Sequence, residues 1–291
     1  MKKAAFILTI VFLFGMLAGC ASLHDDAQII ATTLPVYEFT SKLCDGTGLQ
    51  VGQLVTENIS CLHDYTLQVN QMSMIEGSEV VVISGGGLEE FLTQALESKD
   101  SVIDASIGIT LCEGKHHSHQ NNVHQHETDP HFWLSPAHAK TMVHNICSGL
   151  SAYYPTHKDT FAENENALIL KLDALQEYGD HVLTNLHCTS LITFHDGFSY
   201  FADAYNLDLL HSVEEESGSE ASPAELIEMI ELVQKTQLPA IFVEINGSNA
   251  AAKIISAETG SKVFALDMGM AGNSYFESMY RNIDTVKEAL G

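Results

Sequence analysis

The stretch from Lys158 to Leu183 constrains the fold more than any other part of the chain. It contains no proline, and no glycine before Gly179. Its apolar residues recur at helical spacing: Phe161, Leu168, Leu172, Leu175 and Val182. At 1.5 Å per residue the stretch predicts a single helix of roughly 35 to 40 Å, which is long enough to join two domains. A helix restricts hinge motion more than a flexible linker does.

Alternating strand and helix patterns flank this stretch on both sides. Before it, apolar runs predict strands at 28–33, 50–55, 80–84 and 101–104, and helices after Pro35, at 68–76 and at 88–97. After it, strands are predicted at 190–194, 208–211, 240–243 and 262–266, and a helix at 222–237. That helix begins with Ser222-Pro223 and has Glu225 in place to complete a capping box.

These two series predict an α/β protein of two lobes, each with a mainly parallel sheet flanked by helices, joined by one long connecting helix. The expected boundaries are 28–156 for the N-terminal lobe, 157–185 for the connecting helix and 186–291 for the C-terminal lobe. With 45% hydrophobic residues, the chain is long enough for two domain cores.

The first residues resemble a secretory signal. Lys2 and Lys3 precede an apolar run that ends in Leu17-Ala18-Gly19-Cys20, so residues 1–19 are expected to be a signal peptide. A small-residue triplet ending in cysteine resembles the bacterial lipobox, in which that cysteine is acylated. An ordinary signal peptide or a short anchor helix is the alternative. We therefore expect a protein outside the cytoplasmic membrane, anchored by lipid at Cys20 through a tether of residues 20–27.

The net charge of the chain limits the classes of molecule that it is expected to bind. It has 13 basic and 38 acidic residues, and loss of Lys2 and Lys3 with the signal gives 11 minus 38, or −27 with neutral histidines. Such a field repels nucleic acid and attracts cations, so no nucleic-acid partner is expected. Five cysteines remain after Cys20, an odd number, so at least one is unpaired within the chain. Cys61 is more simply a buried core residue than a soft metal ligand.

Three histidines and an aspartate follow predicted strands or turns at long intervals. His63, His131, His195 and Asp267 are separated by 68, 64 and 72 residues, so they do not form one local metal loop. His195 and Asp267 come directly after predicted strands, as does Glu244, and the carboxyl ends of parallel strands form the ligand crevice of an open sheet. His131 follows Asp129-Pro130, in which the proline limits the chain and the carboxylate is placed to fix the imidazole tautomer.

Three segments of the chain resemble the metal-specific solute-binding lipoproteins of ABC importers. They are Asp129-Pro130-His131-Phe132-Trp133-Leu134, the run from Phe194 to Phe201, and the run from Val82 to Glu89, within a similarity that covers about residues 29–290. The resemblance implies a metal site between two α/β lobes joined by one long helix. His63-Asp64-Tyr65 matches the family's first ligand motif, whereas Thr66-Leu67 departs from it.

The same resemblance favours zinc over manganese. Manganese members of that family have a glutamate where His195 stands, whereas zinc members have a histidine, and imidazole nitrogen suits zinc. His63, His131 and His195 are then the expected ligands, with Asp267 or a water completing a tetrahedron. Glu220 and Glu244 remain alternative acidic ligands. Manganese or iron is the alternative metal.

A histidine-rich segment at residues 115–127 lies before His131. It is polar, has no apolar periodicity, and is expected to be a loop that holds metal weakly. Its five histidines are His116, His117, His119, His124 and His126. Zinc members of the resembling family often have such an insertion.

The function expected from these observations is that of a zinc receptor that delivers the ion to an ABC permease, and not that of an enzyme. A zinc hydrolase is the weakest alternative, because the chain has no His-Glu-x-x-His or Gly-x-Ser-x-Gly motif. Gly85-Gly86-Gly87 follows a strand but lacks the spaced glycines and lysine of a phosphate loop. A surface adhesin is the remaining alternative.

Overall fold

The computed structural model describes residues 27–57, 62, 65–97, 99–112, 128–214, 221–270, 272 and 274–291, without the side chains of residues 213 and 214. Several residues named from the sequence lie outside this part of the chain: Cys20, Cys61, His63, Glu220 and the five histidines of the 115–127 segment. The predicted signal peptide lies outside it as well.

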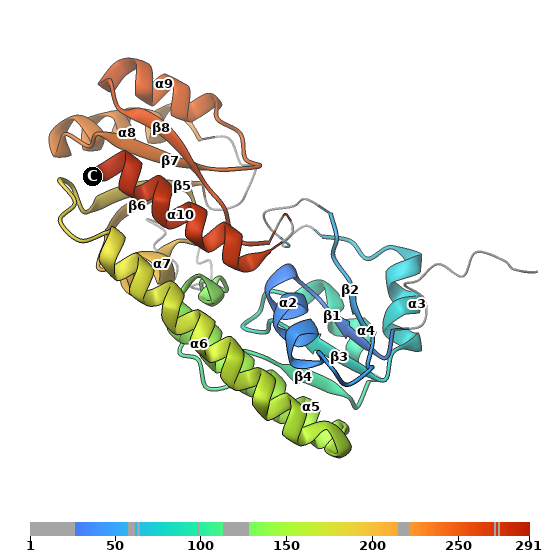
Figure 1. The fold of residues 1–291 in the computed structure, drawn as a ribbon. Helices are drawn as coiled ribbons and strands as arrows, with labels where there is room; N and C mark the ends of the chain where they lie inside the picture. The colour runs from blue at the N-terminus through green and yellow to red at the C-terminus, as the bar shows by residue number, and fades with distance from the viewer. Residues whose placement is uncertain are drawn as a thin grey trace, which may run out of the picture.

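The N-terminal lobe is built on a four-stranded parallel sheet. Its strands are β1 (Ile29–Ala31), β2 (Val51–Gln53), β3 (Val80–Ile83) and β4 (Val102–Asp104), in the order β2-β1-β3-β4. Helices α2 (Leu34–Leu43) and α5 (Pro136–Tyr153) pack on it, while α3 (Val69–Gly77) lies at its far side in Figure 1. The predicted strands are confirmed, although each is shorter than its apolar run.

The helix predicted at 88–97 is confirmed only in part. The structure has a 3₁₀ turn, η1 (Glu90–Leu92), followed by the four-residue helix α4 (Thr93–Leu96). Gly85, Gly86 and Gly87 all have positive φ, and the Glu89 carboxylate accepts hydrogen bonds from the backbone of Ser84 and Gly85 at 2.7 and 2.9 Å. The Glu89 side chain therefore stabilises a turn where helical periodicity alone predicts a first helical turn.

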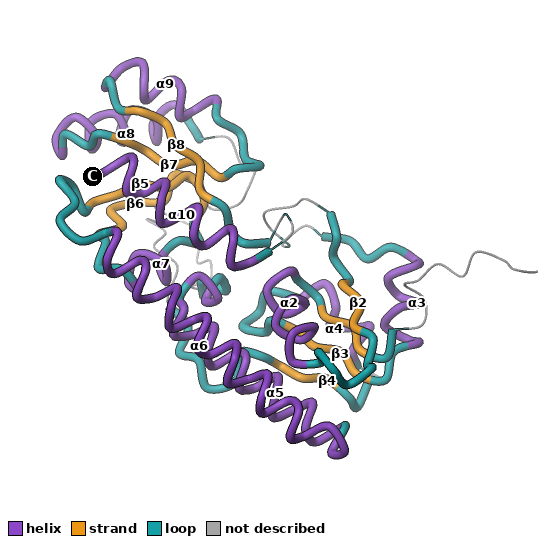
Figure 2. The backbone as a smooth tube through the Cα atoms, viewed as in Figure 1, coloured by secondary structure: helices purple, strands orange, loops and turns teal. Residues whose placement is uncertain are grey.

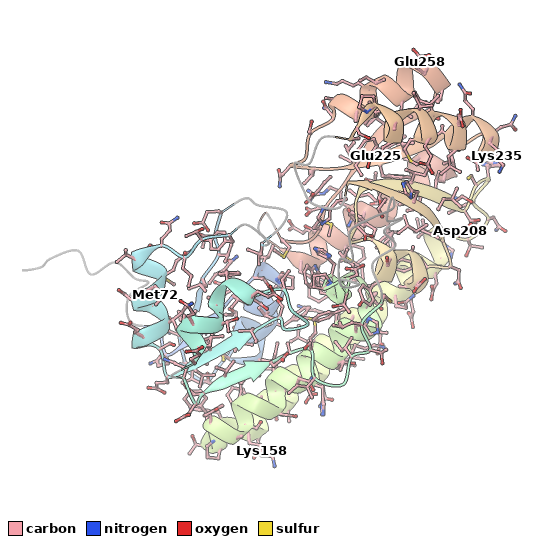
Figure 3. All side chains as sticks on the ribbon, turned by 180° about the vertical axis from the view of Figure 1, so that it is seen from behind. Met72, Lys158, Asp208, Glu225, Lys235 and Glu258 are labelled. Carbon is pink, nitrogen blue, oxygen red and sulfur yellow. The ribbon has the colours of Figure 1, made fainter. Side chains whose placement is uncertain are left out.

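The connecting helix is confirmed as α6 (Lys158–Val182), 25 residues long, which follows the short turn η3 (Pro155–His157). It runs beside α5 and contacts α2 in the N-terminal lobe, and it contacts α10 in the C-terminal lobe (Figure 1). Lys158 is the first residue of α6 and lies at the end of the N-terminal lobe that is farther from the C-terminal lobe, where Asp208 lies (Figure 3). One helix therefore extends along both lobes.

The C-terminal lobe repeats the parallel architecture. Strands β5 (Ser190–His195), β6 (Asp208–Glu214), β7 (Ala240–Glu244) and β8 (Lys262–Leu266) are ordered β6-β5-β7-β8. Helices lie on both faces of this sheet in Figure 2: α7 (Ser199–Ala204) and α10 (Tyr275–Leu290) on one, α8 (Pro223–Thr236) and α9 (Ala250–Thr259) on the other. The predicted capping box at Ser222 and Glu225 is confirmed, and Glu225 and Lys235 lie toward opposite ends of α8 (Figure 3).

The apolar core is shared between the lobes. One cluster of buried side chains includes Phe39 of α2, Leu172 of α6 and Tyr275 of α10, while two smaller clusters lie under α8 and α9 and under α3 and α4. The largest cluster spans both lobes because α6 contacts α2 and α5 of the N-terminal lobe and α10 of the C-terminal lobe. Among the described residues no helix has both the length and the apolar composition needed to cross a bilayer.

Cysteines contribute to this packing as thiols. Cys44 and Cys147 are buried and form no disulfide, which confirms that the chain carries unpaired cysteine. Burial raises the pKa of both thiols to about 12, so they remain protonated and unreactive at neutral pH.

Candidate metal-binding site

His131 is held in one orientation by Asp129. The Asp129 Oδ1 atom accepts hydrogen bonds from the His131 backbone N–H and from its ring Nδ1, both at 2.9 Å, and the two side chains are buried. A carboxylate oxygen only accepts, so this contact places a hydrogen on Nδ1, and in the neutral imidazole Nε2 then carries the lone pair. Nε2 is buried and has no hydrogen-bond partner in the described part of the chain. The hydrogen bond from the His131 ring to Asp129 that the sequence predicted is therefore confirmed, and it leaves the other ring nitrogen without a described protein partner.

His195 lies against His131. It is the last residue of β5, its side chain is 3% exposed, and its ring centroid is 5.2 Å from that of His131 at an interplanar angle of 83°. The two histidines are 64 positions apart in the sequence. The structure thus brings together two of the three predicted histidine ligands, while His63 lies outside the described residues. Its sequence neighbour Leu62 is buried in the shared core.

Glu244 lies beside His195 because of the sheet register. Thr193 of β5 pairs with Phe242 of β7, which places the strand ends His195 and Glu244 side by side. The Glu244 Oε2 atom is 4.0 Å from His195 Nδ1, and both side chains are buried. Glu244, one of the alternative fourth ligands named from the sequence, therefore lies beside one of the paired rings.

Asp267 lies at the same edge of the sheet, directly after β8, but its carboxylate is engaged with α10. Its Oδ1 accepts from the Gly269 N–H at 2.8 Å, and its Oδ2 accepts from Ser278 Oγ at 2.8 Å and from the Arg281 guanidinium. Asn282 also pairs with the Asp267 backbone through two hydrogen bonds of 2.8 and 2.7 Å. Three of the roughly four lone-pair sites of this carboxylate therefore already accept hydrogen bonds from the protein.

The described residues contain no group of three or more His, Cys, Asp or Glu side chains close enough to hold a metal ion. This agrees with the placement of the candidates: His131 and His195 are paired, Asp267 faces α10, and His63 is not among the residues searched. The structure therefore places two of the candidate ligands side by side, and the metal-binding role of every candidate stays a prediction.

Several residues at the site were not assigned a role from the sequence. A Cβ atom on Gly197 would lie 2.8 Å from His131 Nδ1 and 2.4 Å from Met268 Cε, so only glycine lets the chain after His195 approach this ring. The Trp133 indole donates to the Met268 carbonyl at 2.7 Å. The Tyr275 hydroxyl donates to the Trp133 carbonyl at 2.8 Å. These contacts join the His131 segment to the C-terminal lobe. The motifs quoted from the sequence include Gly197 and Trp133, whereas no sequence signal indicated Met268 or Tyr275.

Backbone N–H groups of the glycine triplet after β3 donate to protein side chains. The N–H groups of Ser84 and Gly85 donate to the buried Glu89 carboxylate, which also accepts from Thr32 Oγ1 at 2.6 Å. The carboxyl group of Glu89 thus occupies the position that an anion takes in a phosphate loop. The structure supports the reading that the Gly85-Gly86-Gly87 sequence is not a nucleotide site.

Comparison with known proteins gives a family model and full-length similarities. The model described as ZnuA, "Zinc-uptake complex component A periplasmic", matches residues 29–289. The zinc-binding lipoprotein AdcA of Streptococcus pneumoniae serotype 4 is 30% identical over 307 aligned positions, which cover 99% of this chain and 61% of AdcA. The chain thus spans about three fifths of the AdcA relative.

Two further similarities cover nearly the whole length of both compared chains. The high-affinity zinc uptake system protein ZnuA of Bacillus subtilis is 26% identical, over 99% of this chain and 98% of that protein. A crystal structure of a ZnuA protein superimposes with a TM-score of 0.80 at 27% identity, over 91% of this chain and all of that chain. The two-lobed fold with paired parallel sheets is therefore a known one.

Proposed function

Because the chain belongs to the ZnuA family of zinc-uptake components, we propose that it is an extracytoplasmic receptor that binds zinc and delivers it to an ABC permease. The observation that carries this proposal is the buried pair of imidazoles, His131 and His195, with ring centroids 5.2 Å apart. His131 presents a Nε2 atom that has no described protein partner, and Asp129 fixes it in the metal-binding tautomer.

Zinc is the metal that this donor set favours. Imidazole nitrogen is a good ligand for zinc, whereas manganese prefers carboxylate, carbonyl and water oxygens. We propose His63 as the third histidine ligand and Asp267, Glu244, Glu220 or a water as the fourth donor. A manganese or iron receptor of the same class is the alternative, and direct competition between the metals distinguishes them.

The anchoring of the receptor is part of the proposal. Removal of residues 1–19 and acylation of Cys20 place the lobes outside the cytoplasmic membrane on a tether of residues 20–27, followed by domains at 28–156, 157–185 and 186–291. Mass spectrometry of the mature N-terminus tests this directly. A lipid mass on Cys20 supports it, and an unmodified N-terminus at another residue contradicts it.

Metal binding by single-site variants tests the receptor function. Titration of the wild type against a chromogenic chelator is expected to reveal one tightly bound zinc per chain, with manganese competing poorly. His131→Ala and His195→Ala each remove a donor, so both should weaken zinc binding by more than the roughly 10- to 100-fold that loss of a residue behind a ligand costs. Zinc bound without turnover of ester or phosphate substrates separates the receptor from a hydrolase.

His144→Ala is the matched control for these variants. His144 is an exposed imidazole on α5 that pairs with Glu165 of α6 at 2.8 Å, so its loss removes a histidine without touching the paired rings. Its zinc affinity should equal that of the wild type. Equal affinity in His131→Ala or His195→Ala removes that residue from the set of ligands and contradicts the proposal.

We propose that the histidine-rich segment at 115–127 supplies weak, additional metal sites. Deletion of residues 116–126 removes His116, His117, His119, His124 and His126. Calorimetry should then count fewer weakly bound ions while the one tight site remains. Loss of the tight site on deletion would show instead that the segment provides a primary ligand.

A further inference from the structure

The Tyr200 hydroxyl joins two segments that are distant in the sequence. It donates to the Asp129 carbonyl at 2.8 Å and accepts from the Cys112 N–H at 2.8 Å. The Asp129 N–H in turn donates to the Cys112 carbonyl at 3.0 Å. Tyr200 lies on α7 of the C-terminal lobe, and its side chain is 1% exposed. One buried phenol from the C-terminal lobe therefore fixes the backbone on both sides of the histidine-rich segment.

Asp129 connects this phenol to the candidate ligand. Its backbone carbonyl is held by Tyr200, while its carboxylate holds both the backbone N–H and the ring Nδ1 of His131 at 2.9 Å. A rotation or shift of the Asp129 backbone therefore moves the carboxylate that orients the imidazole. His195, the other described histidine of the site, lies five residues before Tyr200 in the β5–α7 segment. The same segment therefore provides both the His195 ring that packs against His131 and the Tyr200 hydroxyl that holds Asp129.

The ring and the hydroxyl of Tyr200 make separable contributions. The ring packs edge to face against Phe132, at 6.4 Å between centroids, and against His138, at 5.2 Å. The hydroxyl makes the two hydrogen bonds to backbone groups. Burial raises the pKa of this hydroxyl, which keeps it protonated as a donor to the Asp129 carbonyl at neutral pH. Replacement by phenylalanine thus removes the hydrogen bonds and leaves the ring in place.

We propose that Tyr200 is a positioning residue for metal binding, whose hydroxyl fixes Asp129 and through it the orientation of the His131 imidazole toward His195. The proposal rests on the proposed zinc site for its functional meaning. Without the hydroxyl, a buried N–H and a buried carbonyl lose their partner, and the backbone around Asp129 must move or admit water to satisfy them. Such a shift propagates to the imidazole because a metal site depends on residues behind its ligands.

Tyr205→Phe is the matched control for Tyr200→Phe. Tyr205 directly follows α7, is 5% exposed, and its hydroxyl is buried without a hydrogen-bond partner among the described residues. Both substitutions therefore remove one buried phenolic oxygen from the same region. Only one of them breaks hydrogen bonds to the segment that carries His131.

The experiment combines a metal-free and a metal-bound measurement on the full mature chain. In the metal-free protein, ¹⁵N spectra of the histidine side chains report the tautomer of each ring, and comparison with His131→Ala identifies the His131 signals. Zinc affinity is then measured by chelator competition. Tyr200→Phe should shift the His131 ring signals and weaken zinc binding on the order of tenfold, while Tyr205→Phe matches the wild type in both.

Each other outcome is decisive. Wild-type ring signals in Tyr200→Phe overturn the positioning role, whether or not zinc affinity falls, since a loss of affinity alone then reflects a general structural effect. Fast hydrogen exchange of the Cys112 backbone N–H in the wild type would show that its hydrogen bond to the Tyr200 hydroxyl is absent, and this also overturns the positioning role. This measurement needs no variant. If the wild type binds no zinc, the proposed function fails, but the ring signals still decide whether Tyr200 positions His131.

Discussion

Asp129 serves two partners through two chemically different groups. Its carboxylate selects the tautomer of His131, and its carbonyl accepts the hydrogen bond from Tyr200. The first contact was predictable from the sequence because the two residues are only two positions apart and flank a proline. The second was not, because Tyr200 is 71 positions away and reaches Asp129 only when the β5–α7 segment packs on the N-terminal lobe.

Asp129→Asn should weaken zinc binding about tenfold or more. The amide keeps the size of the side chain but removes the charge, and a hydrogen bond to a carboxylate is roughly twice as strong as one to a neutral acceptor. The tautomer of His131 is then less firmly fixed, and its Nε2 lone pair is less basic toward the metal. Chelator competition measures the change.

Asp173→Asn is the control for this substitution. Asp173 pairs with Lys140 at 2.7 Å between α5 and α6, and its side chain is 43% exposed. The Asp173→Asn variant loses a carboxylate charge at a surface position that does not contact the paired imidazoles. Its zinc affinity should therefore stay at the wild-type value. Equal affinity in Asp129→Asn and wild type would mean that the carboxylate does not orient the ligand.

Asp267 shows where residue-level prediction stops. Its position after β8 was predictable from the apolar pattern, and so was its location at the sheet edge. Its pairing with Ser278 and Arg281 was not, because that depends on how the first turns of α10 meet the end of β8. Its role as a metal ligand therefore stays a prediction.

Single elements were predictable where local chemistry decides them. The α8 helix begins at Pro223 because Ser222 and Glu225 cap it reciprocally, which are contacts within four residues. The helix predicted at 88–97 from apolar spacing is helical only at 90–96, as a 3₁₀ turn followed by a short α-helix. The buried contacts of Glu89 to Thr32, 57 positions earlier, and to Ser84 favour a turn, and no local pattern reveals a partner that distant.

The Glu89 turn predicts a pH dependence of stability. Burial raises the pKa of Glu89, although hydrogen bonds from Thr32, Gly85 and Ser84 oppose the shift. A carboxyl group with a higher pKa in the folded than in the unfolded chain binds more protons when folded. The unfolding free energy therefore falls as pH rises through the raised pKa. Glu89→Gln does not titrate, so its metal-free stability should fall less than that of the wild type between pH 5 and 8.

Denaturant unfolding at a series of pH values measures this difference in slope. Glu89→Gln should already be less stable at pH 5, because an amide cannot accept all three hydrogen bonds, so the slope and not the offset is the readout. Glu163→Gln, an exposed carboxyl on α6, should keep the wild-type slope. Parallel curves for Glu89→Gln and wild type would show that Glu89 does not titrate differently in the folded state.

The whole molecule combines a predicted architecture with an unpredicted core. Two parallel sheets and one connecting helix follow from the alternating strand and helix patterns and from the glycine-poor stretch before Leu183. The sequence shows which face of each helix is apolar, but not which element covers it. The shared core of α2, α5, α6 and α10 was therefore not foreseen. Glu38 of α2 also accepts hydrogen bonds from Ser274 Oγ and Tyr275 N–H at the start of α10, at 3.1 and 2.6 Å.

This packing predicts that an unbroken α6 helix fixes the position of the two lobes relative to each other. Leu170 lies in the middle of α6 with 70% of its surface exposed, so its side chain contributes little to the core. Leu170→Pro removes a helical hydrogen bond and places the ring against the preceding turn, which costs about 3 kcal/mol. Leu170→Ala truncates the same side chain and leaves the helix intact. In the metal-free protein, small-angle X-ray scattering should show a broader distribution of interlobe distances for Leu170→Pro than for Leu170→Ala, together with a lower unfolding free energy. Identical scattering from the two variants would mean that the shared core, and not the helix, sets the relative position of the lobes.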